Sequence, residues 1–328
     1  MTNAENLQLI FEQKQPEWVP IWKDSVCHCR PSFFSEWRPA HPEVGKVYKN
    51  FFGISYEYSD PKLVPIASPT HHLFEDITEW KKYFVLPDVS GIDWDAMAEA
   101  DMKGVSREGK MSCLWIGATV LAYLLDAMGH ENTLVAMMEE EEAWHELQTT
   151  VCDWWCDIIQ KCIRAYKADM VIIADDMGFG KAPFMSLSAY REMIKPYMSR
   201  YVKTVRDAGC NMVYHSCGKC EPFIGDWIDM GIQLWECQPV NDFDAMKKQY
   251  GNQLALLCAW DSTAPAAQPG ASEELVRQTV RDMIDQYGQG GGFVFNVEGR
   301  LFEWLVGSEH YGWVYDEARK YGKLVYQR

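Results

Sequence analysis

The chain has 328 residues, of which 48% are hydrophobic, and its formal net charge at pH 7 is -16. This acidic balance argues against nucleic acid as a partner, because nucleic-acid binding requires basic patches. The first residues lack the basic start and apolar block of a signal peptide, and no apolar run approaches the roughly 18 residues of a membrane helix. The 11 cysteines therefore indicate reduced thiols in a cytoplasmic protein rather than a disulfide framework.

The first half of the chain gives a weak pattern of elements. Residues 18–22 and 111–116 are short apolar runs that predict two strands. Residues 24–70, rich in proline, phenylalanine and tyrosine, predict an extended insertion over a pocket, so that the N-terminal region 1–70 is partly irregular. Residues 131–167 predict a long helical stretch whose acidic run, Glu139 to Glu142, forms a solvated face.

The second half repeats one pattern, a buried strand followed by a helix that ends at a glycine. The predicted strands are 170–174, 211–218, 232–239, 254–261 and 292–299, and the predicted helices are 186–209, 221–231, 242–251, 272–288 and a terminal segment up to 322. This rhythm favours a single (β/α)8 TIM barrel over residues 1–328, with an N-terminal extension that covers the barrel mouth. A doubly wound open sheet is the alternative, but no GxGxxG motif follows the first strand.

Polar or reactive side chains stand at the carboxyl end of every predicted strand in the second half. In a barrel these ends form the catalytic face, whereas core packing does not require polar groups there. In chain order the residues are Asp175 and Asp176, His215 and Cys217, Glu236 and Cys237, Trp260 and Asp261, and Asn296 with Glu298. Five such ends in succession favour a functional site over five separate structural roles.

The best metal ligands are His215 and Cys217, two residues apart in the run NMVYHSCGKCEPF. In an extended backbone, residues i and i+2 point to the same side, so both side chains can meet one ion. Zinc accepts an imidazole nitrogen together with a thiolate. A third ligand is needed, and the competing residues are Glu298, Cys237, Glu236 and Cys220.

A second cluster of donors, Cys27-His28-Cys29, follows the first predicted strand. It could reach the same barrel mouth. A role in the pocket wall is the favoured interpretation, because most free cysteines behave as small buried apolar residues.

The run from residue 170 to residue 261 resembles the uroporphyrinogen decarboxylase superfamily, and more closely its branch of cobamide-dependent methyltransferases from anaerobes. The resemblance implies one (β/α)8 barrel of the uroporphyrinogen decarboxylase type. It also implies zinc bound by a His-x-Cys pair after a barrel strand and by a later cysteine. His215 and Cys217 match the pair, and Glu298 stands about where the later cysteine is expected.

The decarboxylases of this superfamily carry arginines just after the first strand, which hold the porphyrin carboxylates. The matching stretch here, VPIWKDSVCHCR, keeps Pro20 and Trp22 but continues with Lys23, Asp24 and Ser25. Arg30 alone is a poor replacement for that clamp. The resemblance therefore favours methyl transfer over porphyrinogen decarboxylation.

The resemblance implies a zinc-dependent methyl transfer from a small methyl ether, aromatic or not, to the Co(I) of a corrinoid on a separate protein, as in an O-demethylase. Zinc would polarise the ether oxygen. Asp175, Asp176 or Asp261 would hold or protonate that oxygen, and the substrate-binding candidates are Trp260, Trp22 and Asn296.

Three alternatives stay open at this point. The first is a metal-free decarboxylase of a small or tetrapyrrole carboxylic acid. The second is a methyltransferase with a thiol or amine as methyl donor or acceptor. The third is a non-catalytic protein that binds zinc or handles a corrinoid.

Overall fold

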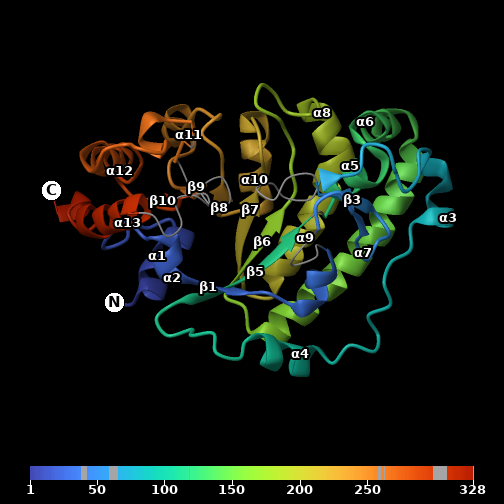
Figure 1. The fold of residues 1–328 in the computed structure, drawn as a ribbon, viewed down its shortest axis with the longest axis horizontal. Coiled ribbons are helices and arrows are strands. Elements are labelled where there is room, and N and C mark those ends of the chain that lie inside the picture. The colour runs from blue at the N-terminus through green and yellow to red at the C-terminus, as the bar shows by residue number, and fades with distance from the viewer. Residues whose placement is uncertain are drawn as a thin grey trace.

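The computed structural model describes residues 1–37, 43–58, 66–117, 119–257, 260–261, 263–297 and 309–327. Within these ranges a parallel sheet curls around an apolar interior, with helices on its outside (Figure 1). Its seven strands, in spatial order, are β1 (Val26–Cys29), β5 (Met111–Gly117), β6 (Met170–Ala174), β7 (Asn211–His215), β8 (Leu234–Glu236), β9 (Ala255–Leu257) and β10 (Phe293–Val294). This arrangement confirms the predicted α/β fold of the TIM-barrel type.

The two edges of the sheet are joined by the residues that precede β1. Ile21 forms a parallel bridge with Phe295, in which the Phe295 amide donates to the Pro20 carbonyl at 2.8 Å and the Trp22 amide donates to the Phe295 carbonyl at 2.9 Å. The strand predicted at residues 18–22 is therefore wrong in position. Only Ile21 pairs there, because the chain then turns through the short helix α2 (Trp22–Ser25) before it enters β1.

The helices lie outside the sheet, apart from α1 at its amino end. In Figure 1, α11 to α13 lie on one side of the sheet and α5 to α7 on the other. Their bounds are α1 (Asn3–Phe11), α3 (Trp80–Tyr83), α4 (Trp94–Asp101), α5 (Ala122–Met128), α6 (His130–Glu139), α7 (Glu141–Tyr166), α8 (Leu187–Ala189), α9 (Lys195–Asp207), α10 (Ile224–Met230), α11 (Phe243–Tyr250), α12 (Glu273–Tyr287) and α13 (Glu309–Tyr321). Short 3-10 turns occupy Ser32–Trp37, Ile77–Glu79, Glu221–Phe223, Pro265–Ala267 and Val325–Gln327, and a π-helical turn occupies Tyr190–Ile194.

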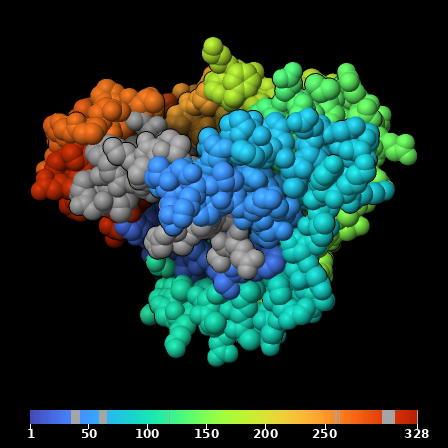
Figure 2. All heavy atoms as spheres, turned by 45° about the vertical axis from the view of Figure 1, so that its right-hand side comes forward, coloured from blue at the N-terminus to red at the C-terminus, as the bar shows by residue number. Residues whose placement is uncertain are grey.

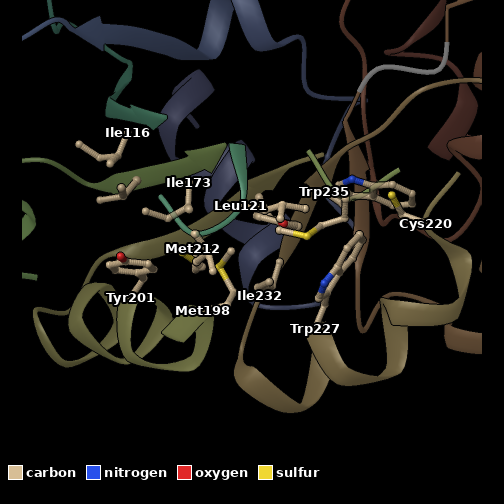
Figure 3. Packing of buried hydrophobic residues seen from close by; sticks show 14 of the residues in the cluster. Ile116, Leu121, Ile173, Met198, Tyr201, Met212, Cys220, Trp227, Ile232 and Trp235 are labelled. Atoms are coloured by element: carbon tan, nitrogen blue, oxygen red, sulfur yellow. The ribbon is translucent and has the colours of Figure 1, made fainter. Parts of the chain in front are cut away.

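Successive side chains along each strand point to opposite faces of the sheet and so form two apolar layers. One set of side chains fills the inside of the sheet and is closed at the amino ends of the strands by α1. It comprises Met111, Cys113, Met170, Ile172, Val213, Leu234, Ala255, Leu257 and Val294, together with Leu7, Ile10, Phe11, Trp22 and Val26. The other set packs against the helices, as Figure 3 shows for Ile116, Ile173 and Met212 facing Met198 and Tyr201 of α9.

This alternation decides which strand-end residues face the barrel mouth. On β7 the inward position after Val213 is His215, and on β8 the inward position after Leu234 is Glu236. The two strands pair in register, with His215 opposite Glu236. The sheet therefore places an imidazole and a carboxylate side by side on its inner face.

The predicted N-terminal insertion forms a small antiparallel sheet of β2 (Val47–Lys49), β3 (Ser55–Glu57) and β4 (Ile66–Ala67). In Figure 2 the blue to cyan residues around this sheet and α3 cover one face of the molecule. Aromatic rings anchor the insertion on α7, with Phe51 and Phe52 at 6.1 and 5.6 Å from Trp154. Aromatic pairs at such distances add to the burial energy of their rings.

Two long predicted helices are interrupted in the structure. The segment predicted at 186–209 begins with Ser186, whose hydroxyl accepts from the Ala189 amide, and continues through the π-helical turn into α9. The segment predicted at 131–167 breaks at Glu140 into α6 and α7, and its acidic run is exposed as expected. Among the helices that the structure describes, none is both long and apolar enough to span a membrane.

Candidate metal centre

Three potential metal ligands meet at the carboxyl ends of β6 and β7. One donor atom each from Asp176, His215 and Cys217 lies within 4.8 Å of the other two. His215 Nε2 is 3.4 Å from Cys217 Sγ and 3.6 Å from Asp176 Oδ1. All three residues are partly buried. His215 is the last residue of β7, whereas Cys217 lies in the loop that follows, so the predicted pair forms although the strand ends earlier than expected.

The backbone of the two loops fixes this geometry. The Cys217 amide donates to Asp176 Oδ1 at 2.8 Å, which ties the loop after β7 to the loop after β6. Gly218 adopts a φ of +81°, a left-handed conformation that favours glycine. The buried side chain of Asn241 donates to the Gly218 carbonyl at 2.9 Å and accepts from the Cys220 amide at 2.9 Å. These bonds hold the loop from residue 217 to residue 220 in one conformation.

The end of β8 contacts both residues of the His-x-Cys pair. Glu236 Oε2 lies 2.9 Å from His215 Nδ1, the ring nitrogen that does not face Cys217. Two residues further on, Gln238 Nε2 donates to Cys217 Sγ at 3.4 Å. The sequence indicated Glu236 as a competing ligand, but the structure places it against the far side of the imidazole. Gln238 was missed, although its spacing from Glu236 repeats the spacing of the pair.

The pKa values of His215 and Cys217 depend on the burial of the two side chains and on their contacts. Burial lowers the pKa of His215, but the hydrogen bonds with Cys217 and Glu236 and the negative charges of both raise it more, and the result lies well above 6.5. Burial raises the pKa of the Cys217 thiol, and the hydrogen bond with His215 offsets only part of that increase. A bound cation would favour the thiolate form of Cys217, which is the form that ligates metals.

Aromatic side chains border the site. Trp115, at the next inward position after Cys113 on β5, is 40% exposed, and its ring centroid lies 5.5 Å from that of His215. His28 of β1 shares the inward face with Val26 and lies 6.2 Å from Trp22, centroid to centroid. Burial, with the nearby charge of Arg30, lowers the pKa of His28 and favours its neutral form. Trp115 was missed, and its inward register on β5 is the signal that could have found it.

Asp175 has a different environment from its neighbour Asp176. Its carboxylate is 1% exposed and accepts hydrogen bonds from the backbone amides of Val120, Leu121 and Ala122, which open α5. The predicted role in catalysis therefore has less support than a structural role at the start of this helix.

The remaining predicted side chains lie outside the three-donor cluster. Asp261 is exposed and accepts from the Thr263 amide at 2.8 Å, which closes a local turn. Trp22 is 6% exposed and packs in the inner apolar layer, whereas Trp260 is 1% exposed and packs in the outer one. Asn296 is half-buried, two residues beyond β10. The geometry favours packing roles for the two tryptophans over contact with substrate.

Glu298, Cys237 and Cys220 were the other candidates for the third ligand. Glu298 lies outside the described residues. Cys237 is buried in the outer apolar layer, with Sγ 3.6 Å from the Leu257 carbonyl oxygen. Cys220 is also buried there, with Sγ 3.4 Å from Ser216 Oγ. Within the described part of the chain, Asp176 is the residue that completes a set of three donors with His215 and Cys217.

The donor set suits zinc better than a hard cation. One imidazole nitrogen, one thiolate and one carboxylate oxygen are the three donor types that zinc accepts, and three protein ligands leave a position for substrate or water. Magnesium and calcium prefer oxygen ligands alone. The residues present therefore fit a zinc ion with an open coordination position.

Comparison with known proteins places this barrel in a family. The family model described as uroporphyrinogen decarboxylase (URO-D) matches residues 116–301, more than half of the chain. Uroporphyrinogen decarboxylase of Mycolicibacterium smegmatis is 30% identical over 106 residues, which are 31% of this chain and 29% of the relative. That of Bacillus thuringiensis is 23% identical over 196 residues, which are 56% of this chain and 51% of the relative. The matched part thus spans about half or less of these relatives.

A solved structure extends the similarity to the whole chain. A methyltransferase from Methanosarcina mazei superposes with a TM-score of 0.67 and 12% sequence identity, covering 98% of this chain and 99% of that one. At this identity the superposition shows a shared fold. The family match over more than half of the chain shows that the chain belongs to the uroporphyrinogen decarboxylase (URO-D) family.

Proposed function

We propose that this chain is a methyltransferase that holds zinc at Asp176, His215 and Cys217. The methyl donor in this proposal is a small methyl ether, and the acceptor is the Co(I) corrinoid of a separate protein. The observation that carries the proposal is the meeting of three donor atoms within 4.8 Å at the catalytic face of the barrel. The fold shared with a methyltransferase from Methanosarcina mazei supports it.

Zinc, when bound, would supply Lewis-acid polarisation of the ether oxygen. The protein's own residues would orient the donor and stabilise the departing oxygen. Trp115 offers an exposed aromatic face beside His215, against which the organic part of the donor can pack. The carbon–oxygen bond breaks with its electron pair on oxygen, the Co(I) acceptor contributes the pair for the new bond to the methyl group, and the oxygen takes up one proton. The second product is therefore an alcohol or a phenol.

A decarboxylase is the second candidate, because the curated relatives carry that name. The segment after Trp22 does not favour it. Lys23 Nζ lies 4.2 Å from the ring centroid of Tyr311, and Asp24 pairs with Arg319 at 2.7 and 2.8 Å. Both side chains are thus engaged with α13. Among the described residues at this position, no arginine cluster is available to hold several carboxylates.

The direct test is methyl transfer from a panel of methoxylated aromatics to free Co(I) cobalamin, followed by its visible absorption. We expect methylcobalamin and a demethylated phenol in equal amounts with the zinc-loaded protein. The His215→Ala variant should lose this activity, whereas the control Cys156→Ala, on α7 and away from the cluster, should retain it. Release of CO2 from carboxylic acids by zinc-free protein, without methyl transfer from any donor, would favour the decarboxylase instead.

A further inference from the structure

The residues at the end of β8 pair one to one with the two residues of the His-x-Cys motif. Glu236 contacts His215 and Gln238 contacts Cys217, so an i, i+2 spacing on one strand end faces the same spacing on the next. The parallel register sets this up, because His215 lies opposite Glu236.

The contact between Glu236 and His215 selects one tautomer of the imidazole. Both side chains are largely buried, with 15% and 18% of their surface exposed, and Oε2 lies 2.9 Å from Nδ1. The carboxylate accepts a hydrogen bond from Nδ1–H, so that Nε2, which faces Cys217 and Asp176, is the nitrogen whose lone pair would bind a metal ion. Metal-ligating histidines almost always have this arrangement, in which the outer ring nitrogen donates to a carboxylate, a carbonyl or water.

The contact between Gln238 and Cys217 has a defined direction. The Gly218 amide donates to Gln238 Oε1 at 2.8 Å, so the oxygen of the side-chain amide faces that N–H. The nitrogen therefore faces Cys217 Sγ, at 3.4 Å. Asn241 restrains the same segment through the Gln238 carbonyl, to which its Nδ2 donates at 3.0 Å. A hydrogen bond from a neutral amide stabilises negative charge on the sulfur.

We propose that Glu236 and Gln238 are positioning residues of the metal centre, an inference that rests on the proposed zinc site. Glu236 holds His215 as the Nδ1–H tautomer and fixes its ring, and Gln238 reduces the electron donation from the Cys217 sulfur to the metal. Neither residue is a ligand in this arrangement. Glu236 thereby orients the imidazole and increases its basicity, whereas Gln238 leaves more positive charge on the metal for an oxygen atom of the substrate.

The test is zinc affinity, measured by competition with a chromophoric chelator, and the absorption spectrum of the Co(II)-substituted protein. Loss of an outer-shell partner costs roughly 10–100-fold in metal affinity, so Glu236→Ala should bind zinc that much more weakly. Glu236→Gln should lose less, because its amide oxygen still accepts from Nδ1–H. Gln238→Ala should shift the thiolate-to-cobalt absorption band, which a purely structural role would leave in place.

The matched control is Glu317→Gln. Glu317 is also a largely buried carboxylate, but it pairs with Arg277 and Arg281 on the outside of the barrel. This variant should lower thermal stability and leave zinc affinity unchanged. If wild-type protein binds zinc and Glu236→Ala binds it equally tightly with an unaltered cobalt spectrum, the inference about β8 is wrong and the proposed function stands. If wild-type protein binds no zinc at all, both are overturned.

Discussion

Gly218 and Gly178 cross so closely that a Cβ atom on Gly218 would lie 2.2 Å from the carbonyl carbon of Gly178. This crossing brings the loop after β6, which carries Asp176, against the loop after β7, which carries Cys217. The carboxylate and the thiol can share one ion because neither backbone carries a side chain at that point.

Substitution of Gly218 by alanine should therefore disrupt the metal centre. The new Cβ would meet backbone atoms of the neighbouring loop, and the φ of +81° would add strain of about 1–3 kcal/mol. We expect less than one zinc per chain and a lower melting temperature. Gly180→Ala is the control, because no atom lies within 4 Å of its added Cβ. Equal zinc content in the two variants would contradict this account.

The adjacent aspartates should respond differently to the same change. Asp175→Asn should lower the free energy of unfolding by about 1–3 kcal/mol, because one of the two oxygens that accept from buried backbone amides is replaced by an NH2 group, which cannot accept them. Asp176→Asn should leave stability nearly unchanged and weaken zinc binding by roughly 10-fold or more, since even outer-shell losses reach that size. Denaturant unfolding and chelator competition separate the two effects. If Asp175→Asn weakened zinc binding and Asp176→Asn lowered the free energy of unfolding, the roles assigned to the two aspartates would be exchanged.

The stability contributed by Asp226 should depend on pH. Burial raises the pKa of this carboxyl, but hydrogen bonds from Lys195 and Arg191 lower it more, so the folded-state pKa lies below 3.8. A depressed pKa contributes stability that is fully present above the unfolded value and is lost as the pH falls through the folded one. Asp226→Asn should therefore reduce the melting temperature at neutral pH, and the difference from wild type should shrink below about pH 4. A difference that stays constant with pH would contradict this assignment.

Trp115 should affect substrate binding without affecting the metal. It is 40% exposed beside His215, so its loss removes aromatic surface from the mouth rather than from the core. Trp115→Ala should raise KM for an aromatic methyl ether and leave zinc content at the wild-type level. Trp115→Phe should recover most of the loss, because it retains a flat aromatic face. Unchanged KM in the alanine variant would place the substrate elsewhere.

Much of the fold could be predicted, because runs of buried residues indicate the strands and polar residues indicate their carboxyl ends. The buried runs around Ile172 and Val213 predicted β6 and β7, and His215 and Cys217 were found from their spacing. The first strand was misplaced, because the apolar run at residues 18–22 continues into a helical turn that only pairing with Phe295 explains.

The third donor could not be predicted from spacing alone. Asp175 and Asp176 are equivalent in sequence, and the start of α5, far away along the chain, decides which one is buried against backbone amides. The contact of Gln238 with Cys217 depends on the register of β7 with β8 and on the turn that Asn241 holds. Such contacts arise from tertiary structure, so a local pattern does not show them.

The central claim is that Asp176, His215 and Cys217 form a zinc site, and elemental analysis of the purified protein tests it most directly. We predict about one zinc per chain in the wild type, a stoichiometry expected for a single three-ligand site. The double variant His215→Ala, Cys217→Ala should contain none, and Cys156→Ala should match the wild type. An absence of zinc from the wild type, even after zinc is supplied, or its retention in the double variant, would contradict the account.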